Sequence, residues 1–164
     1  MKKKLLGTLV TAASLTALLL PASAASAATQ TTSDLTSGHL RNPAVQGNQC
    51  LVHFSNGSAG DNPAFYTCLN YDDQTWYYPK PGTIGPIINK YSLKYMTAQG
   101  YDPSPAFLYF NSGYPDQQWS ADYLPGSQDI QFRNQHSNLC LTVNSSGNLI
   151  QDYCQDFYRQ AWFS

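Results

Sequence analysis

The chain has 164 residues, 13% of them aromatic and only 12% charged, with a formal net charge of −1 and no Glu. Its first residues combine a basic start at 2–4, an apolar run at 5–20 and a small-residue segment at 21–28, which is the pattern of a secretory signal. A retained membrane anchor is the alternative, but the run is short and interrupted by Thr and Ser. Without residues 1–28, six basic residues face ten Asp, a net charge of −4. No basic run is left to bind nucleic acid or an anionic membrane surface. We therefore expect a secreted, extracellular protein with no nucleic-acid partner and no membrane insertion.

Residues 29–37 are rich in Thr and Ser and lack apolar periodicity, so we expect a disordered leader there. From residue 38 to residue 164, short apolar segments alternate with turns rich in Gly, Pro, Asn and Asp, and no stretch has helical periodicity. The predicted strands, in chain order, include 50–52, 64–66, 84–88, 95–97, 107–109, 129–132, 140–143 and 149–150. This pattern predicts one all-β domain, a barrel or a sandwich with about twelve strands and little or no α-helix.

Three Gln-x-Trp tripeptides dominate the pattern, and they contain the only three tryptophans: Trp76, Trp119 and Trp162, 43 residues apart both times. A fixed period of this size indicates an internal repeat of three similar units. Because residues i and i+2 of a strand share a face, each Trp can fill a core layer while the Gln binds nearby backbone groups. We interpret the three Trp as scaffold. A role for the Gln residues in ligand contact is the minority interpretation.

Four cysteines in an exported chain favour disulfides. Three pairings are possible, and the repeat favours Cys50–Cys68 in the first unit and Cys140–Cys154 in the third. Each bond would contribute about 3 kcal/mol in the chain-entropy model. The absence of any Cys-x₂-Cys pair argues against the alternative, a four-cysteine metal site.

This combination of motifs resembles the ricin B-type lectins from about residue 39 to the end of the chain. It consists of three Gln-x-Trp motifs, Cys-Leu at the start of a unit, and a Cys eight residues before a Trp. The resemblance implies a single β-trefoil, with three four-stranded lobes around a pseudo-threefold axis. It also implies carbohydrate binding without a cofactor or a metal.

The resemblance also suggests where a sugar would bind. The family has a stacking aromatic two residues before the second Cys of a unit and an Asn or Asp just before Gln-x-Trp. The matching residues and their polar neighbours form our candidate carbohydrate-binding set: Tyr66, Asn70, Asp73, Gln74, Tyr109, Asp116 and Gln117. Two alternatives remain open, because the tyrosines could pack between lobes and the Asp and Asn side chains could cap local turns.

The family's main polar anchor is missing. In binding lobes an Asp usually stands two residues after the opening Cys and grips vicinal sugar hydroxyls. Here Val52, Thr97 and Thr142 occupy those positions.

We expect a carbohydrate-binding module with weak sites that gain strength by multivalency. An enzyme is not expected, since there is no Glu and no Gly-x-Ser-x-Gly, His-Glu-x-x-His or phosphate-loop motif. The alternative is a protein-interaction module on a lectin scaffold, such as a non-catalytic subunit of a secreted toxin complex or an inhibitor. The missing anchor and the abundant Tyr favour this alternative.

Overall fold

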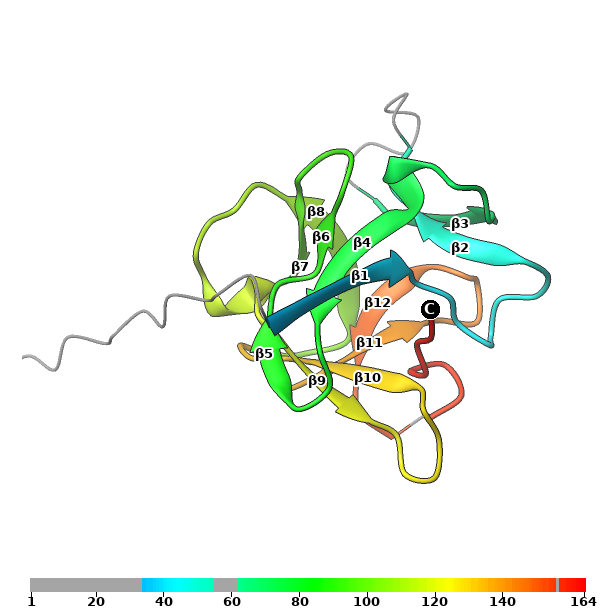
Figure 1. Ribbon diagram of the computed structural model, residues 1–164. Helices are drawn as coiled ribbons and strands as arrows, with labels where there is room; N and C mark the ends of the chain where they lie inside the picture. Colours follow the sequence, from blue (N-terminus) through cyan, green and yellow to red (C-terminus); the bar gives the residue numbers. More distant parts are fainter. Residues whose placement is uncertain (1–33, 55–61, 156) are drawn as a thin grey trace, which may run out of the picture.

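Twelve strands and two 3₁₀ helices are present in the residues that the computed structural model describes, 34–54, 62–155 and 157–164 (Figure 1). No α-helix occurs in these ranges, as predicted. The first unit contains β1 (Leu35–His39), β2 (Gln49–Val52), β3 (Ala64–Thr67), η2 (Asp72–Gln74) and β4 (Thr75–Pro79). The second contains β5 (Thr83–Gly85), β6 (Ile88–Asn89), β7 (Tyr95–Ala98), β8 (Ser104–Tyr109), η3 (Pro115–Gln117) and β9 (Trp119–Tyr123). The third contains β10 (Ile130–Asn134), β11 (Cys140–Val143) and β12 (Leu149–Asp152).

The strands form a barrel with three hairpins attached to it, which is the predicted β-trefoil. Strand β1 pairs with β4, β4 with β6, β5 with β9 and β9 with β10, all antiparallel. Two bridges, Ile130 to Trp162 and Arg41 to Phe163, connect β10 through the last residues back to the chain after β1. The hairpins are β2–β3, β7–β8 and β11–β12, one for each lobe.

Two predictions need correction. The expected disordered leader includes residues 35–37, which belong to β1 and pair along β4 from Leu35↔Pro79 to His39↔Thr75. The alternation of Leu35, Ser37 and His39 on one face is too short to stand out in a segment rich in Thr and Ser. The expected strand 84–88 is divided into β5 and β6, because Pro86 has no N–H to offer to a ladder. The signal at 1–28 and residues 29–33 lie outside the described residues.

The three tryptophans of the repeat form the centre of the core, and all are completely buried. Each indole Nε1–H donates a hydrogen bond to the carbonyl of the equivalent residue in the first strand of its own hairpin. A buried indole needs such a partner, so the bond fixes the hairpin relative to the barrel. The pairs are Trp76 with Leu51 (2.9 Å), Trp119 with Met96 (3.0 Å) and Trp162 with Leu141 (3.0 Å).

A second threefold set, which the sequence reasoning missed, consists of the buried residues Asn42, Asn89 and Asn134. Each donates through Nδ2 to the carbonyl of the residue just before the Gln-x-Trp of the preceding unit. Asn42 closes the ring from the third unit to the first. The acceptors are Arg159 for Asn42, Asp73 for Asn89 and Asp116 for Asn134, all at 2.9 Å.

Both predicted disulfides are confirmed: Cys50–Cys68 and Cys140–Cys154. No free cysteine occurs within the described ranges. The second lobe has Tyr95 and Asn111 at the equivalent positions, so its hairpin is held without a cross-link.

The asparagine ring gives a stability prediction. Asn134→Ala should lower the free energy of unfolding by about 1–3 kcal/mol, because it leaves the Asp116 carbonyl and the β10–β11 turn without their buried partner. The matched control is Asn148→Ala at an exposed turn position, where we expect a change within about 0.5 kcal/mol. Equilibrium urea unfolding measures both variants, and equal losses would contradict a structural role for the ring.

Candidate functional site

In the first lobe, the segment that follows β2 contacts both Tyr66 and Asp73. Tyr66 lies on β3 and is 51% exposed, with the Phe54 ring packed edge-on against it at 5.7 Å between centroids. The adjacent residue, His53, donates its backbone N–H to the Asp73 carbonyl (2.9 Å). One short segment, 53–54, therefore contacts both the aromatic and the acidic member of the predicted site. Asn70 is exposed in the loop that connects them.

The second lobe has Tyr109 and Asp116 at the equivalent positions, with a different aromatic neighbour. Tyr109 lies on β8 and is 52% exposed, and Phe110 packs edge-on against it at 6.0 Å. The Nζ of Lys94 lies 5.2 Å from the Phe110 ring centroid, a cation–π contact that holds this ring on the outer side. The tyrosines of both lobes thus face outward, and neither is packed between lobes.

The two carboxylates share an unusual property. One oxygen of each, Oδ1 of Asp73 and Oδ1 of Asp116, is buried and has no hydrogen-bond partner among the described residues. A buried acceptor without a partner is costly. The same atom lacks a partner in both lobes that carry a half-exposed Tyr, so the two Asp side chains have equivalent surroundings.

Gln74 and Gln117 are better assigned to the scaffold than to the site. Both are buried, at 2% and 1% exposure. Gln74 accepts from the Leu69 N–H (2.6 Å) and donates to the Thr67 carbonyl (2.8 Å). Gln117 makes the corresponding bonds to Ser112 and Phe110 (both 2.8 Å). Their amides hold the loop after each hairpin by hydrogen bonds, so Gln74 and Gln117 belong to the scaffold and not to the candidate sugar site.

The positions of the missing anchor are also part of the scaffold. Thr97 donates to the Tyr95 carbonyl (3.0 Å) and accepts from Gln117 Nε2 (3.0 Å). Thr142 donates to the Cys140 carbonyl (2.8 Å) and accepts from Gln160 Nε2 (3.0 Å). Both threonines and Val52 are buried. None of the three positions therefore presents a polar side chain that could take the place of the sugar-binding Asp.

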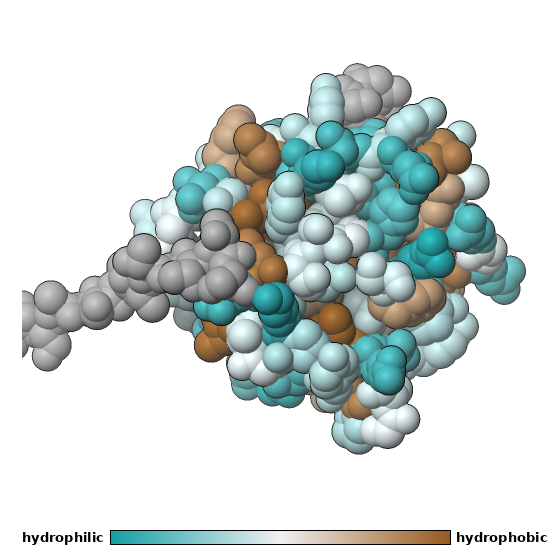
Figure 2. Space-filling view, viewed as in Figure 1, coloured by the Kyte–Doolittle hydropathy of each residue, from teal (hydrophilic) through white to brown (hydrophobic). Residues whose placement is uncertain are grey.

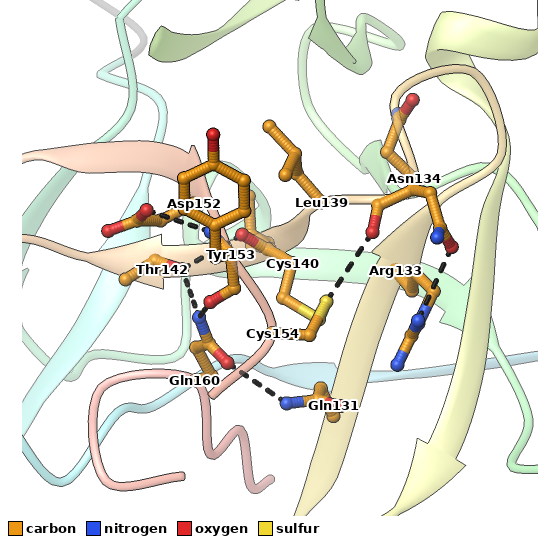
Figure 3. Close-up of a disulfide and its surroundings, with 12 residues drawn as sticks. Gln131, Arg133, Asn134, Leu139, Cys140, Thr142, Asp152, Tyr153, Cys154 and Gln160 are labelled. Carbon is orange, nitrogen blue, oxygen red and sulfur yellow. Dashed lines mark hydrogen bonds between the residues drawn. A yellow bond between two sulfur atoms is a disulfide. The ribbon is translucent and has the colours of Figure 1, made fainter. Parts of the chain in front are cut away.

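The third lobe is built differently, as Figure 3 shows around its disulfide. Asp152 stands where the other lobes have their Tyr, and its Oδ1 accepts the N–H of Tyr153 (2.8 Å). Gln160 binds the Tyr153 carbonyl (2.7 Å) and accepts from Gln131 (3.0 Å). Arg159 replaces the Asp of the other two lobes. The aromatic and carboxylate pair is therefore confined to lobes one and two.

A further aromatic, which the sequence reasoning missed, stands five residues before each tryptophan. Tyr71 and Tyr114 are the residues just before η2 and η3, and Phe157 holds the same position in the third unit. All three are exposed, at 60%, 66% and 56%. The signal was present in the sequence as a third residue with the 43-residue period.

A surface ion pair lies near the candidate site of the first lobe, between Lys90 Nζ and Asp72 Oδ1 at 2.8 Å. The hydrogen bond to Asp72, reinforced by its charge, raises the pKa of Lys90. The pair engages Oδ1 of Asp72, and no ion pair is found at Asp73 among the described residues. No group of three or more His, Cys, Asp or Glu that could hold a metal is found in the described part of the chain.

The scaffold role of the threonines can be measured. Thr142→Val keeps the shape that Val52 has in lobe one but removes the acceptor of Gln160, so the free energy of unfolding should fall by about 1–3 kcal/mol. Thr67→Val, at an exposed position of β3, is the matched control and should change little. Thermal and urea unfolding give the comparison. A loss no larger than that of the control would mean that the Thr142 hydroxyl is not needed by the fold.

Comparison with known proteins agrees with the geometry. The model of the ricin-type β-trefoil lectin domain matches residues 36–162. ThreeFoil, a designed threefold symmetric protein, is 20% identical with a TM-score of 0.63, over 77% of this chain and 95% of its own. The hemolytic lectin CEL-III is 28% identical with a TM-score of 0.61, over 77% of this chain and 29% of its own. A lectin of Polyporus squamosus, bound to the epitope Neu5Aca2-6Galb1-4GlcNAc, is 14% identical with a TM-score of 0.62, over 77% of this chain and 47% of its own.

The chain thus spans less than half the length of these two natural lectins. No curated protein sequence matches it. The family match covers most of the chain and coincides with the observed three-lobed barrel. The chain belongs to the ricin-type β-trefoil lectin family.

Proposed function

We propose that this protein is a secreted, non-catalytic carbohydrate-binding module with two weak glycan sites, one in lobe one and one in lobe two. One observation carries the proposal: lobes one and two each have a half-exposed Tyr, Tyr66 or Tyr109, and a half-buried Asp, Asp73 or Asp116, at equivalent positions. A sugar offers a hydroxyl donor for the carboxylate and an apolar C–H face for the ring. Membership of a lectin family supports the same conclusion.

Weak binding follows from the missing anchor. With Val52, Thr97 and Thr142 buried in the scaffold, each site grips its sugar with one carboxylate rather than two polar anchors. Two such sites on one rigid body favour surfaces that carry many copies of the glycan, because the second contact is made at high effective concentration.

Secretion and the absence of catalysis are part of the proposal. Two disulfides are typical of an oxidising, extracellular environment. The described residues contain no helix of the length and apolarity needed to cross a membrane. Glycosidases generally flank the scissile bond with two carboxyl groups. In lobe one the second carboxylate, Asp72, is paired with Lys90.

A specific observation favours the second candidate function, a protein-interaction module. Exposed aromatics also occur away from the two tyrosines of the site, including Tyr71, Tyr114, Phe157 and Tyr158, and aromatic side chains are enriched at protein interfaces. Competition by free sugar separates the two functions, because it would displace a glycan surface and leave a protein partner bound.

The glycan sites can be tested by array and by calorimetry. Tyr66→Ala/Tyr109→Ala should weaken binding to immobilised glycans by roughly tenfold or more, since an aromatic contact of about 1.4 kcal/mol is lost at each site. Asp73→Ala/Asp116→Ala should do the same, while Tyr123→Ala, which removes a 61% exposed tyrosine on β9, serves as the matched control. Each single-site variant should retain binding to free sugar at the other site but lose avidity on the surface.

The array should include galactose-containing glycans, because the epitope bound by the Polyporus squamosus lectin contains galactose. If the wild-type protein binds no glycan or polysaccharide, or if Tyr123→Ala is as damaging as the double variants, the proposal is wrong.

A further inference from the structure

A row of paired residues crosses the sheet and ends at Tyr109. Residues that lie opposite one another in neighbouring antiparallel strands place their side chains on the same face. Starting at β1, the pairs run through β4, β6, β7 and β8, and each pairing is part of the observed register. We call these five residues the lobe-two row: Ser37, Tyr77, Ile88, Tyr95 and Tyr109.

The lobe-two row forms the floor of a groove. None of its five members is buried; Ser37 and Tyr109 are exposed and the others half-buried. A hollow of about 830 Å³ is lined by the first four members together with Leu35, Lys80 and Leu93. Figure 2 shows apolar side chains gathered beside the start of β1, on a face that is otherwise largely polar. The hollow therefore extends along the barrel from β1 to Tyr95, whose strand partner is Tyr109 of the candidate sugar site.

The other lobes do not have this continuation. The equivalent row in lobe three runs through the paired residues Ile84, Ser120, Arg133, Cys140 and Asp152, with no aromatic among them. In lobe one the residue opposite Tyr66 is a fully buried disulfide cysteine, Cys50. Lobe two lacks the disulfide, and Tyr95 takes the position of that cysteine beside Tyr109.

Leu93 gives an independent reason to regard the groove as a built surface. Its backbone has φ 56°, in the left-handed region, and its side chain is 66% exposed on the groove wall. The equivalent turn of lobe three has Asn138 with φ 63°, and Asn tolerates this region far better than a bulky apolar residue. An exposed Leu in this conformation contributes little to the core. Its side chain instead adds apolar area to the wall of the groove.

We propose that the lobe-two row binds an extended glycan chain, with one end unit on Tyr109 and the following units over Tyr95, Ile88 and Tyr77. This inference rests on the proposed function, because it extends the lobe-two site. Neighbouring strands lie about 4.8 Å apart, which is close to the length that one pyranose unit adds to an extended chain. The lobe-two site thus takes the end of a chain and about four sugar units in all, while the lobe-one site takes a single sugar.

Length dependence of binding tests the proposal. We would titrate the full chain with β-1,4-linked ladders of galactose, glucose and xylose, from one unit to five, by isothermal calorimetry. The affinity of the wild-type protein should rise by roughly tenfold or more between one unit and four for at least one ladder, as expected for added aromatic contacts. It should then level off at five units, because the row ends at β1.

Three variants separate the groove from the end site. Tyr77→Ala should abolish most of the gain with length and leave the binding of the single sugar unchanged. Leu93→Asn, which copies the turn of lobe three, should do the same without loss of thermal stability, so that a folding defect cannot explain the result. Tyr91→Ala, at a 55% exposed tyrosine in the same β6–β7 turn but outside the groove lining, is the matched control.

The outcomes distinguish this inference from the proposed function. Affinity that does not change with length, or a gain that survives both Tyr77→Ala and Leu93→Asn, overturns the groove even if the array has found a sugar for Tyr66 and Tyr109. Failure of all three ladders overturns it as well. A blank array with the wild-type protein would overturn the proposed function itself.

Discussion

Hydrogen bonds from buried indole and amide side chains to backbone carbonyls are the interaction on which the rest of this structure depends. The loops that connect hairpins to barrel strands contain polar backbone groups that have no ladder partner and need another one. Trp, Gln and Asn provide those partners once in each lobe, as with Trp119 to Met96, Gln117 to Phe110 and Asn134 to Asp116. These three bonds join residues 23, 7 and 18 positions apart. The Trp and Gln bonds lie within a lobe and the Asn bonds connect neighbouring lobes, so the lobes are fixed to one another as well as internally.

Some polar side chains make hydrogen bonds that the fold requires, and others do not. The hydroxyls of Thr97 and Thr142 belong to the first group, because they accept hydrogen bonds from the neighbouring Gln amides. Asp73 and Asp116 are bound only through their carbonyls, which leaves one carboxylate oxygen of each buried and unpartnered. The loss of one disulfide frees the position of Tyr95 in the second lobe. The candidate binding surfaces are formed by side chains that make no hydrogen bonds required by the scaffold.

Much of the fold could be predicted because its strongest signal is periodic. Trp76, Trp119 and Trp162 recur at a fixed spacing, and that spacing also identified the disulfide partners. Strand β1 could not be found in this way, since Leu35–His39 becomes recognisable only by its pairing with β4. Burial could not be predicted from the sequence either: Gln74 and Asp73 are adjacent, yet Gln74 is enclosed by the loop that it binds, whereas Asp73 is only half-buried.

The candidate site was predicted in part. Tyr66 and Tyr109 were predicted from their place two residues before the second Cys position of the unit, and both are about half exposed. The aromatics Tyr71 and Tyr114 share the 43-residue period but were not predicted, because they lie outside the Gln-x-Trp and Cys positions that define the repeat. The lobe-two row could not be predicted at all, since it joins five strands whose register is decided only by the folded barrel.

The most direct test of this account is a two-dimensional ¹⁵N–¹H NMR titration of the full chain with the best glycan from the array. The account predicts shifts of the backbone amides around Tyr66 and Asp73 and around Tyr109 and Asp116, with the three buried indole Nε1–H signals nearly unmoved. Shifts confined to lobe three, around Asp152 and Arg159, or large shifts of the indole signals would contradict the division between scaffold and binding surface.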